Sequence, residues 1–328
     1  MDQILDTQNK TRISDTIFTN INKLQHEEYQ YLNVLQHILD NGFWEEGRNG
    51  KTKSIFGESM RFSLKDHKIP ILTTKKTAWK TCLKELLWFI RGETDNKLLK
   101  KQGVHIWDAN SSREFLDSRG LTLTQEDLIG PGYGYQWRYF NANYNCFTGK
   151  RLLDNDLKDI HKNVTSFKGI DQLQTIIEGL KNPLTRTSRR HIMTAWNPCQ
   201  LDQMALPPCH ILCQFNVHDG NKLSCSMYQR SGDFPLGIPF NIASYSFLTH
   251  LLAKHCGLEA YEFVHFVGNC HIYEDHIEPM KEQILREPYP FPTFTIKQVR
   301  ENISDYQVDD FEIHNYKSHE AITMKMVA

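Results

Sequence analysis

The sequence predicts a single α+β domain, built as a mixed sheet packed with helices. Segments with helical spacing and strand-like segments follow one another without the regular strand–helix–strand order of a doubly wound fold. The chain has 328 residues and 40% hydrophobic content, enough for one large core or two modest ones. No repeat, low-complexity tract or linker divides it, so one domain is expected.

The N-terminal half begins with a polar extension, 1–27, which is typical of a weakly ordered segment. Residues 28–328 are expected to form the folded domain. Apolar residues at helical spacing, followed by Asn41-Gly42 as a stop signal, predict the first helix. In chain order, this half is expected to hold a helix at 29–41, strand pieces at 54–57 and 60–64, and an apolar helix at 77–91.

The middle of the chain holds a polar stretch, 141–168, rich in Asn, Lys and Asp, which predicts a surface insertion. Short β-rich runs and apolar helical runs then alternate to the C-terminus, and Gly257 ends the last helix. The expected elements are a helix at 171–181, strands at 189–196, 210–217 and 223–229, a helix at 240–256, and strands at 263–267 and 294–297.

Composition excludes several function classes. The net charge of −1 gives no global basic field for nucleic acid, so any anion site must be local. No run of apolar residues is long enough to span a membrane, and the N-terminus lacks the order of a signal peptide. The eight cysteines lack paired short spacings, which favours reduced thiols in the cytoplasm (or nucleus) and no metal site.

A group of reactive residue types lies between positions 206 and 241. Cys209 follows two prolines and opens a strand-like run, and Arg230, Asp233 and Asn241 follow within about thirty residues. A thiol near its usual pKa of about 8.5 attacks only when a cation or a helix N-terminus favours the thiolate. Arg230 can be that cation. The alternative is that Cys209 is a small buried hydrophobe, as most cysteines are.

The sequence of these segments resembles that of the thymidylate synthase family, and of its eukaryotic-type branch in particular. The resemblance rests on Pro207-Pro208-Cys209-His210, on Gln229-Arg230-Ser231-Gly232-Asp233 and on the run from Phe240 to Tyr245, and it extends from Tyr29 to Ala328. It implies that Cys209 adds to carbon 6 of deoxyuridylate (dUMP). Carbon 5 then takes a one-carbon unit and a hydride from methylenetetrahydrofolate, giving thymidylate and dihydrofolate.

The resemblance also implies a phosphate cradle of arginines. Arg48 resembles the family's mobile Arg loop, and Arg230 and Ser231 lie beside the nucleophile. Arg189 and Arg190 resemble a pair that reaches the substrate phosphate of the other subunit across a homodimer interface formed by a sheet face. Without the resemblance, adjacent arginines before a strand are more simply a solvated charge pair.

The pyrimidine and the sugar have their own expected contacts. Asn241 matches the residue that bonds the uracil edge, although its place near a helix start also suits an N-cap. Gln229 is expected beside it in the nucleotide site, and His271 and Tyr273 match the pair that holds the sugar hydroxyl. Asn241, where relatives acting on deoxycytidylate carry Asp, favours deoxyuridylate.

Proton transfer and folate binding complete the site that the resemblance implies. Glu85, a carboxylate on an apolar helix, matches the family's proton relay, and Tyr133 matches a tyrosine near carbon 5. Asp233, counted with the nucleotide contacts as well, matches the residue that bonds the pterin. Trp107 resembles a folate-stacking tryptophan, and Ala328 belongs to a C-terminal segment that closes over bound ligands.

Two positions depart from the family pattern. Asn269 stands where Asp is usual, and Asp275 stands where Asn is common. Two alternatives to a thymidylate synthase stay open. A pyrimidine-nucleotide hydroxymethyltransferase shares the covalent start but traps the methylene with water. A catalytically weak relative that binds RNA belongs to another class, and the near-neutral charge argues against RNA as its main task.

Overall fold

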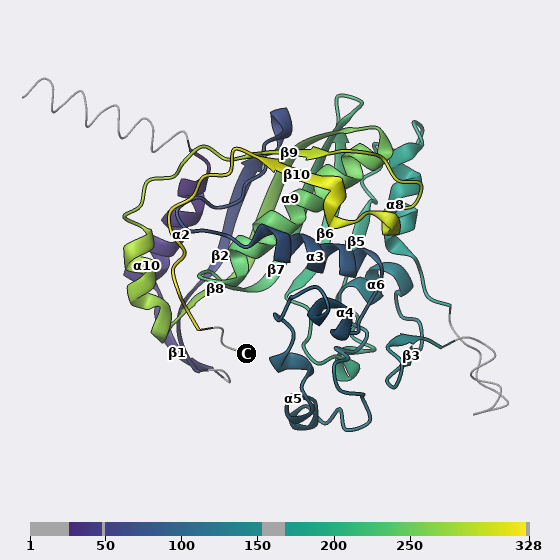
Figure 1. Ribbon diagram of the computed structural model, residues 1–328, viewed down its shortest axis with the longest axis horizontal. Helices are drawn as coiled ribbons and strands as arrows, with labels where there is room; N and C mark the ends of the chain where they lie inside the picture. The colour runs from purple at the N-terminus through teal and green to yellow at the C-terminus, as the bar shows by residue number, and fades with distance from the viewer. Residues whose placement is uncertain (1–25, 48–49, 153–167, 326–328) are drawn as a thin grey trace, which may run out of the picture.

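The computed structural model describes residues 26–47, 50–152 and 168–325 and confirms an α+β fold. A six-stranded mixed sheet runs in the order β1-β2-β8-β7-β6-β5 (Figure 1). Its pairs are antiparallel except β7 and β8, which run parallel. The sheet strands are β1 (Phe43–Gly47), β2 (Gly50–Ser63), β5 (Ile192–Thr194), β6 (His210–His218), β7 (Lys222–Asp233) and β8 (Glu259–Tyr273).

Two small sheets and a set of helices accompany the main sheet. The small sheets are β3 (Tyr144–Asn145) with β4 (Lys150–Arg151), and β9 (Thr293–Ile296) with β10 (Phe311–His314). The α-helices are α2 (Glu28–Asn41), α3 (Trp79–Ile90), α4 (Lys97–Lys100), α5 (Arg113–Ser118), α6 (Gly134–Tyr139), α8 (Gln172–Lys181), α9 (Gly237–Cys256) and α10 (Ile277–Gln283). Short 3-10 turns include η1 (Lys65–His67) and η4 (Glu274–His276).

Helix α9 is the centre of the core. Nearly all of its side chains are buried, because it lies between the sheet on one side and α3 with the β9–β10 pair on the other (Figure 1). Phe247 packs edge-to-face on Phe294 of β9, with ring centroids 5.2 Å apart. The helix ends at Gly257, whose φ of 69° is the left-handed conformation that glycine adopts without cost.

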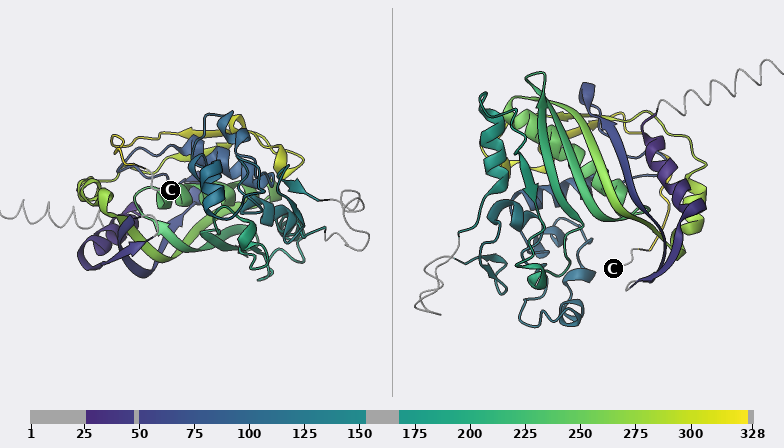
Figure 2. Two further views of the ribbon diagram at one scale, coloured as in Figure 1. Left: turned by 90° about the horizontal axis from the view of Figure 1, so that it is seen from below. Right: turned by 180° about the vertical axis from the view of Figure 1, so that it is seen from behind.

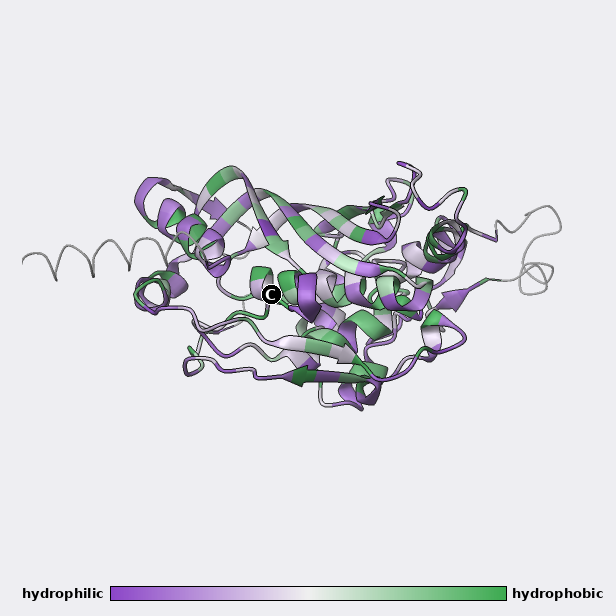
Figure 3. Cartoon of the chain, turned by 90° about the horizontal axis from the view of Figure 1, so that it is seen from above, coloured by the Kyte–Doolittle hydropathy of each residue, from purple (hydrophilic) through white to green (hydrophobic). Residues whose placement is uncertain are grey.

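The face of the sheet opposite α9 is bare of helices (Figure 2). Residues along the strands alternate between the two faces, and hydrophilic and hydrophobic residues alternate with them (Figure 3). Leu212, Tyr228 and Phe266 lie directly opposite one another on β6, β7 and β8. They are 36%, 38% and 44% exposed, so this face presents a row of large apolar side chains.

The four predicted helices are confirmed. The predicted strands are mostly part of longer strands, but the one predicted at 189–196 is shortened to β5, Ile192–Thr194. The pieces at 54–57 and 60–64 belong to the single strand β2, and 263–267 is the centre of β8. Because β7 and β8 pair in parallel as far as Asp233 and His271, both strands continue through the candidate site. Strands β1 and β10 and helix α10 were not predicted. Most of the extension, and 153–167 of the insertion, lie outside the described residues.

Glu28 fastens α2 to the segment that precedes α3. The helix turns Tyr31, Leu35 and Ile38 inwards, and all three are fully buried. Glu28, also fully buried, accepts hydrogen bonds from the backbone N–H and hydroxyl groups of Thr73 and Thr74, at 2.6–3.0 Å. Several donors therefore depend on one carboxylate.

Replacing Glu28 by alanine is expected to lower the free energy of unfolding by about 3 kcal/mol or more, because buried donors left without acceptors each cost about 1–3 kcal/mol. Chemical denaturation measures the loss. Asn33→Ala, an exposed position on the same helix, is the matched control and should change stability little. Equal midpoints for the two variants would contradict a fastening role for Glu28.

Candidate active site

Cys209 lies just before β6, half-buried, where two other elements meet it. Its backbone N–H donates to the hydroxyl oxygen of Tyr133 at 2.9 Å, and its carbonyl accepts from the backbone N–H of Arg230 at 2.9 Å. The first contact comes from the loop before α6, and the second comes from β7. The peptide that carries the thiol is therefore fixed from both sides.

The guanidinium of Arg230 is held against the two prolines before the nucleophile. Its Nε donates to the carbonyl oxygen of Pro208 at 3.0 Å, and its Nη2 donates to that of Pro207 at 2.9 Å. Within the described part of the chain, no carboxylate forms an ion pair with it. A guanidinium without an ion-pair partner suits a phosphate.

Tyr133 is held in a strained position. Its φ of 40° lies in the region that non-glycine residues rarely adopt. The next residue must be glycine, because a Cβ at Gly134 would lie 2.2 Å from the carbonyl oxygen of Phe89. The ring of Phe89 stacks on Tyr133 with centroids 5.0 Å apart. Burial raises the pKa of Tyr133 well above its ordinary value, and the neighbouring Cys209 adds to this. The phenol therefore stays protonated.

Glu85 lies on α3 beside Trp107. Trp107 donates its indole N–H to Glu85 Oε1 at 2.7 Å. Burial raises the pKa of Glu85 to about 7, and the hydrogen bond from Trp107 partly opposes that rise. A carboxyl with this pKa exchanges protons readily at neutral pH, which suits a general acid and base.

Asn241 belongs to a buried polar network and is not an N-cap. It lies inside α9, whose N-cap is Leu236, so the capping alternative is wrong. Gln229 donates its amide N–H to Asn241 Oδ1 at 3.0 Å, and its own Oε1 pairs with Nε2 of His265 at 2.9 Å. With its oxygen engaged by Gln229, the Asn241 side chain offers its NH₂ group to a ligand acceptor.

Two histidines that the sequence analysis did not select lie beside this network. Burial lowers the pKa of His210 to about 4, which a hydrogen bond with Asn241 partly opposes. Burial, with His210 nearby, lowers the pKa of His265 to about 3. Both rings are therefore neutral at pH 7 and act only as hydrogen-bond partners. The adjacency of His210 to Cys209 was the available signal, whereas His265 needed the three-dimensional pairing.

Asp233 lies at the end of β7 among charged neighbours. Burial raises its pKa to about 6, while His276 and Lys75 lower it. Lys75 is itself buried and donates to the carbonyl oxygen of Pro235, and burial lowers its pKa to about 8. His276 Nε2 donates to the carbonyl oxygen of Lys325 at 2.8 Å, so the described C-terminal segment reaches this end of the site.

The parallel pairing of β7 and β8 places two further site positions opposite each other. Ser231 pairs with Asn269, and Asp233 pairs with His271. Asn269 Oδ1 lies 2.9 Å from Nδ1 of His271, so an amide oxygen can orient this ring as a carboxylate would. The ring of Tyr273 meets that of His271 edge-to-face at 5.4 Å. The departure at Asn269 therefore preserves the local contact without a charge.

The remaining predicted residues are separate from this group or are not described. Arg189 and Arg190 are exposed in the turn before β5 and make no side-chain hydrogen bond or ion pair with the described site residues. Arg48 and Ala328 lie outside the described residues. The chain as folded thus brings together Cys209, Arg230 and Tyr133, with Glu85 and Asn241 close by.

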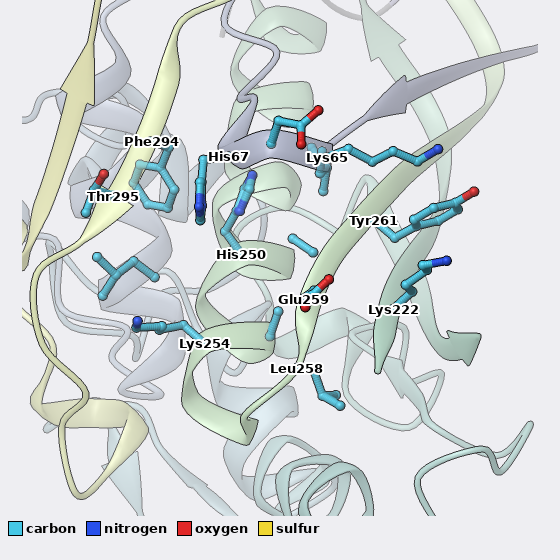
Figure 4. A pocket seen from close by; sticks show the side chains of 15 residues that line it. Lys65, His67, Lys222, His250, Lys254, Leu258, Glu259, Tyr261, Phe294 and Thr295 are labelled. Atoms are coloured by element: carbon cyan, nitrogen blue, oxygen red, sulfur yellow. The ribbon is translucent and has the colours of Figure 1, made fainter. Parts of the chain in front are cut away.

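A cavity lies away from Cys209 and its neighbours. A hollow of about 650 Å³ is lined by residues of η1, α9, β8 and β9, and none of the candidate site residues lines it (Figure 4). Among the residues described by the structure, there is no cluster of three or more metal-ligating side chains. The helices of the described part include none that is both long and apolar enough to cross a membrane.

Comparison with known proteins identifies the family. The family model for thymidylate synthase matches residues 29–328. The chain is 49% identical to human thymidylate synthase over 303 residues, covering 92% of this chain and 91% of that protein.

Bifunctional relatives match over part of their length. The chain is 48% identical to the bifunctional dihydrofolate reductase-thymidylate synthase of Leishmania major over 304 residues, and 48% identical to that of Plasmodium berghei over 313 residues. These matches cover 92% and 95% of this chain but 55% and 50% of those proteins, so the chain spans about half their length. On these matches and on the geometry around Cys209, the chain belongs to the thymidylate synthase family.

Proposed function

We propose that this protein converts dUMP and methylenetetrahydrofolate to thymidylate and dihydrofolate. The observation that carries the proposal is the position of Cys209, fixed by the Tyr133 hydroxyl and by Arg230, whose guanidinium has no ion-pair partner among the described residues. A nucleophilic thiol beside a free cation suits a substrate that has both an electrophilic ring and a phosphate. Family membership gives the same reaction.

In the proposed reaction, the Cys209 thiolate adds to carbon 6 of the pyrimidine, and Asn241 stabilises the charge that moves to the carbonyl oxygen on carbon 4. Carbon 5 then bonds to the methylene carbon carried by the folate. Glu85 relays protons, with Tyr133 beside the carbon that loses one. The two bonds that joined the methylene carbon to folate nitrogens break, the second as carbon 5 loses its proton. The folate then supplies the hydride that completes the methyl group and is thereby oxidised to dihydrofolate, and Cys209 leaves as the thiolate. No metal enters this sequence.

The substrate contacts are assigned in the same way. We assign the phosphate to Arg48, Arg230 and Ser231, the base to Asn241 and Gln229, and the sugar hydroxyl to His271 and Tyr273. We assign the folate to Trp107, Asp233 and the C-terminal segment that ends at Ala328. The docking of Lys325 on His276, next to Asp233, supports a role for that segment at the folate end.

Asn241→Asp is expected to shift preference from dUMP towards deoxycytidylate. The Asn241 NH₂ group suits the carbonyl at carbon 4 of uracil, whereas a carboxylate accepts the exocyclic amino proton of cytosine. One mismatched buried polar pair costs about 1–3 kcal/mol, so the ratio of kcat/KM values should move roughly tenfold to a hundredfold. Kinetics with both nucleotides measures it. Unchanged discrimination would remove Asn241 from base recognition.

We infer that two copies pair through the bare face of the sheet. The row formed by Leu212, Tyr228 and Phe266 is an apolar surface that an isolated chain would leave in water. Arg189 and Arg190 are exposed before the edge strand β5, where a partner's phosphate site can use them. A closed two-fold dimer pairs one face with its own copy.

Subunit mixing tests the shared site. Arg190→Ala and Cys209→Ala proteins should each be weakly active or inactive alone. When they are mixed, heterodimers should recover activity, because one site then has both Cys209 and a partner's Arg190. Cys209→Ala mixed with Cys209→Ser is the matched control and should recover nothing. Proven heterodimers without recovery would show that Arg190 serves only its own chain.

The reaction itself is tested by mixing the protein with dUMP and methylenetetrahydrofolate and following dihydrofolate by absorbance. A rise that depends on Cys209 supports the synthase. A hydroxymethylated nucleotide without dihydrofolate would instead identify a hydroxymethyltransferase. We assign the catalytic domain to residues 28–328 and place the protein in a reducing compartment, the cytoplasm or nucleus, since all eight cysteines are free.

A further inference from the structure

The cavity lined by η1, α9, β8 and β9 has the size of a small-ligand site. Its volume is about 650 Å³, within the range of roughly 300–1,000 Å³ that such pockets occupy. It opens between η1, β9 and the first residues of β8, over the C-terminal turns of α9 (Figure 4). The cavity is a separate feature of the molecule, because Cys209 and its partners contribute nothing to its wall.

His250 of α9 offers this cavity a fixed hydrogen-bond acceptor. Its Nε2 lies 2.8 Å from the carbonyl oxygen of Lys68, and a carbonyl only accepts, so Nε2 carries the proton. Nδ1 is then a lone-pair acceptor, and no described residue donates to it. The side chain is 7% exposed, and burial lowers its pKa to about 4. The ring stays neutral, and its Nδ1 can accept a hydrogen bond from an N–H or O–H group of a ligand.

The same end of the cavity has an apolar wall. The ring of Phe294 meets that of His250 at 62°, with centroids 5.2 Å apart. Phe294, Leu64 and Leu258 are all buried, at 1%, 1% and 8% exposure, and all line the cavity. A flat ring with a hydrogen-bond donor on its edge matches these apolar side chains and the acceptor of His250, with the polar side chains of His67 and Thr295 at the same end.

Two ammonium groups lie around Tyr261 at the other end, and the carboxylates of Asp66 and Glu259 also line the cavity. The Lys65 ammonium lies 4.5 Å from the centre of that ring, and the Lys222 ammonium lies 5.7 Å from it. Lys222 is paired with Asp219 at 2.6 Å, whereas Lys65 has no ion-pair partner among the described residues. Figure 4 shows both lysines on the Tyr261 side and His250 with Phe294 on the other. Two ammonium groups favour a phosphate.

The turn between the two ends is strained. Asp66 and His67 follow one another with φ values of 56° and 61°, a conformation that costs non-glycine residues free energy. Both side chains are exposed, and neither has a hydrogen-bond or ion-pair partner in the described structure. His67 lies beside His250 at the cavity, as Figure 4 shows.

We propose that this cavity binds a nucleoside monophosphate. The phosphate lies between Lys65 and Lys222, the base packs on Phe294, and a base N–H donates to Nδ1 of His250. A nucleotide carries a donor-bearing ring at one end and a phosphate at the other, as the cavity carries His250 at one end and the two lysines at the other. The site does not depend on the reaction proposed above.

Calorimetric titration with adenosine monophosphate tests the site, in saturating dUMP so that the proposed catalytic site is already filled. We expect binding with a Kd below about 1 mM, the weak end of the ordinary affinity range. Lys65→Glu should weaken it at least about tenfold, the effect of roughly 1.4 kcal/mol. Adenosine and inorganic phosphate, each with half of the recognised groups, should each bind more weakly than the nucleotide.

Two controls keep the result interpretable. Lys317→Glu removes another lysine that lies over an aromatic ring, 4.0 Å from that of Tyr289, and should leave binding unchanged. His250→Phe should abolish binding, provided that its melting temperature matches the parent protein. No binding up to about 1 mM, or binding that survives Lys65→Glu, overturns the proposal. Inorganic phosphate that binds as tightly as the nucleotide also overturns it. Lys65 has no part in the Cys209 site, so failure here leaves the proposed reaction untouched.

Discussion

Replacing Cys209 by alanine is expected to lower kcat by at least about 10⁴-fold, because removal of a covalent nucleophile costs factors of this order. No neighbouring group can replace the thiol. Tyr133 and Arg230 hydrogen-bond to the backbone of Cys209 but cannot form the covalent bond to carbon 6. Nucleotide binding should survive, because Arg230 and Asn241 keep their contacts with Pro207, Pro208 and Gln229. Turnover and equilibrium nucleotide binding, measured on the same preparation, separate the two effects.

Cys213→Ala is the matched control for that experiment. Cys213 lies on the same strand, β6, but is 1% exposed and belongs to the core. Its removal should lower stability modestly through a lost packing group and leave kcat nearly unchanged. A Cys209→Ala protein that kept its turnover would rule out Cys209 as the nucleophile. A Cys213→Ala protein that lost turnover while folded would show that the loss is not specific to Cys209.

The helices could be predicted because their signal is local. In α2 the apolar residues recur at helical spacing, and in α9 a long apolar run is closed by Gly257, so neighbouring residues alone indicate the structure. Strand length depends on the partner instead. Strand β8 continues to Tyr273 because β2 and β7 pair with it on both sides, and no short window of sequence contains those partners.

The site was predicted unevenly for a similar reason. Cys209, Arg230 and Asn241 lie within one stretch of chain whose sequence resembles the thymidylate synthase family, so they could be selected together. His265 reaches Asn241 only through Gln229, and Lys75 reaches Asp233 from the segment before α3. Such contacts depend on pairing and packing between distant residues. The predicted helix at 240–256 starts only one residue before Asn241, whereas α9 starts at Gly237, so that Asn241 lies within the helix and meets Gln229.

Glu85→Gln is expected to lower kcat by about 10²–10⁴-fold, the usual contribution of a positioned general acid or base. Glutamine keeps the size of the side chain and an oxygen that can accept from the Trp107 indole, so the site should keep its shape. The nucleotide dissociation constant should therefore change little. A rise in KM alone, with kcat preserved, would assign Glu85 to binding and not to proton transfer.

The pH dependence distinguishes proton transfer from a purely structural role. Burial raises the pKa of Glu85 from 4.5 to about 7, so the folded state binds the proton more tightly than the unfolded chain does. The stability that this proton contributes is complete below about pH 4.5 and is lost as pH rises through about 7. Glu85→Gln removes that ionisation, so its melting temperature should vary less than the parent's over the same interval. The pH profile of kcat should lose its inflection near 7 in the same variant. If the stability profile flattens but the kcat profile does not, the proton on Glu85 matters for folding alone, and another group must move protons in the reaction.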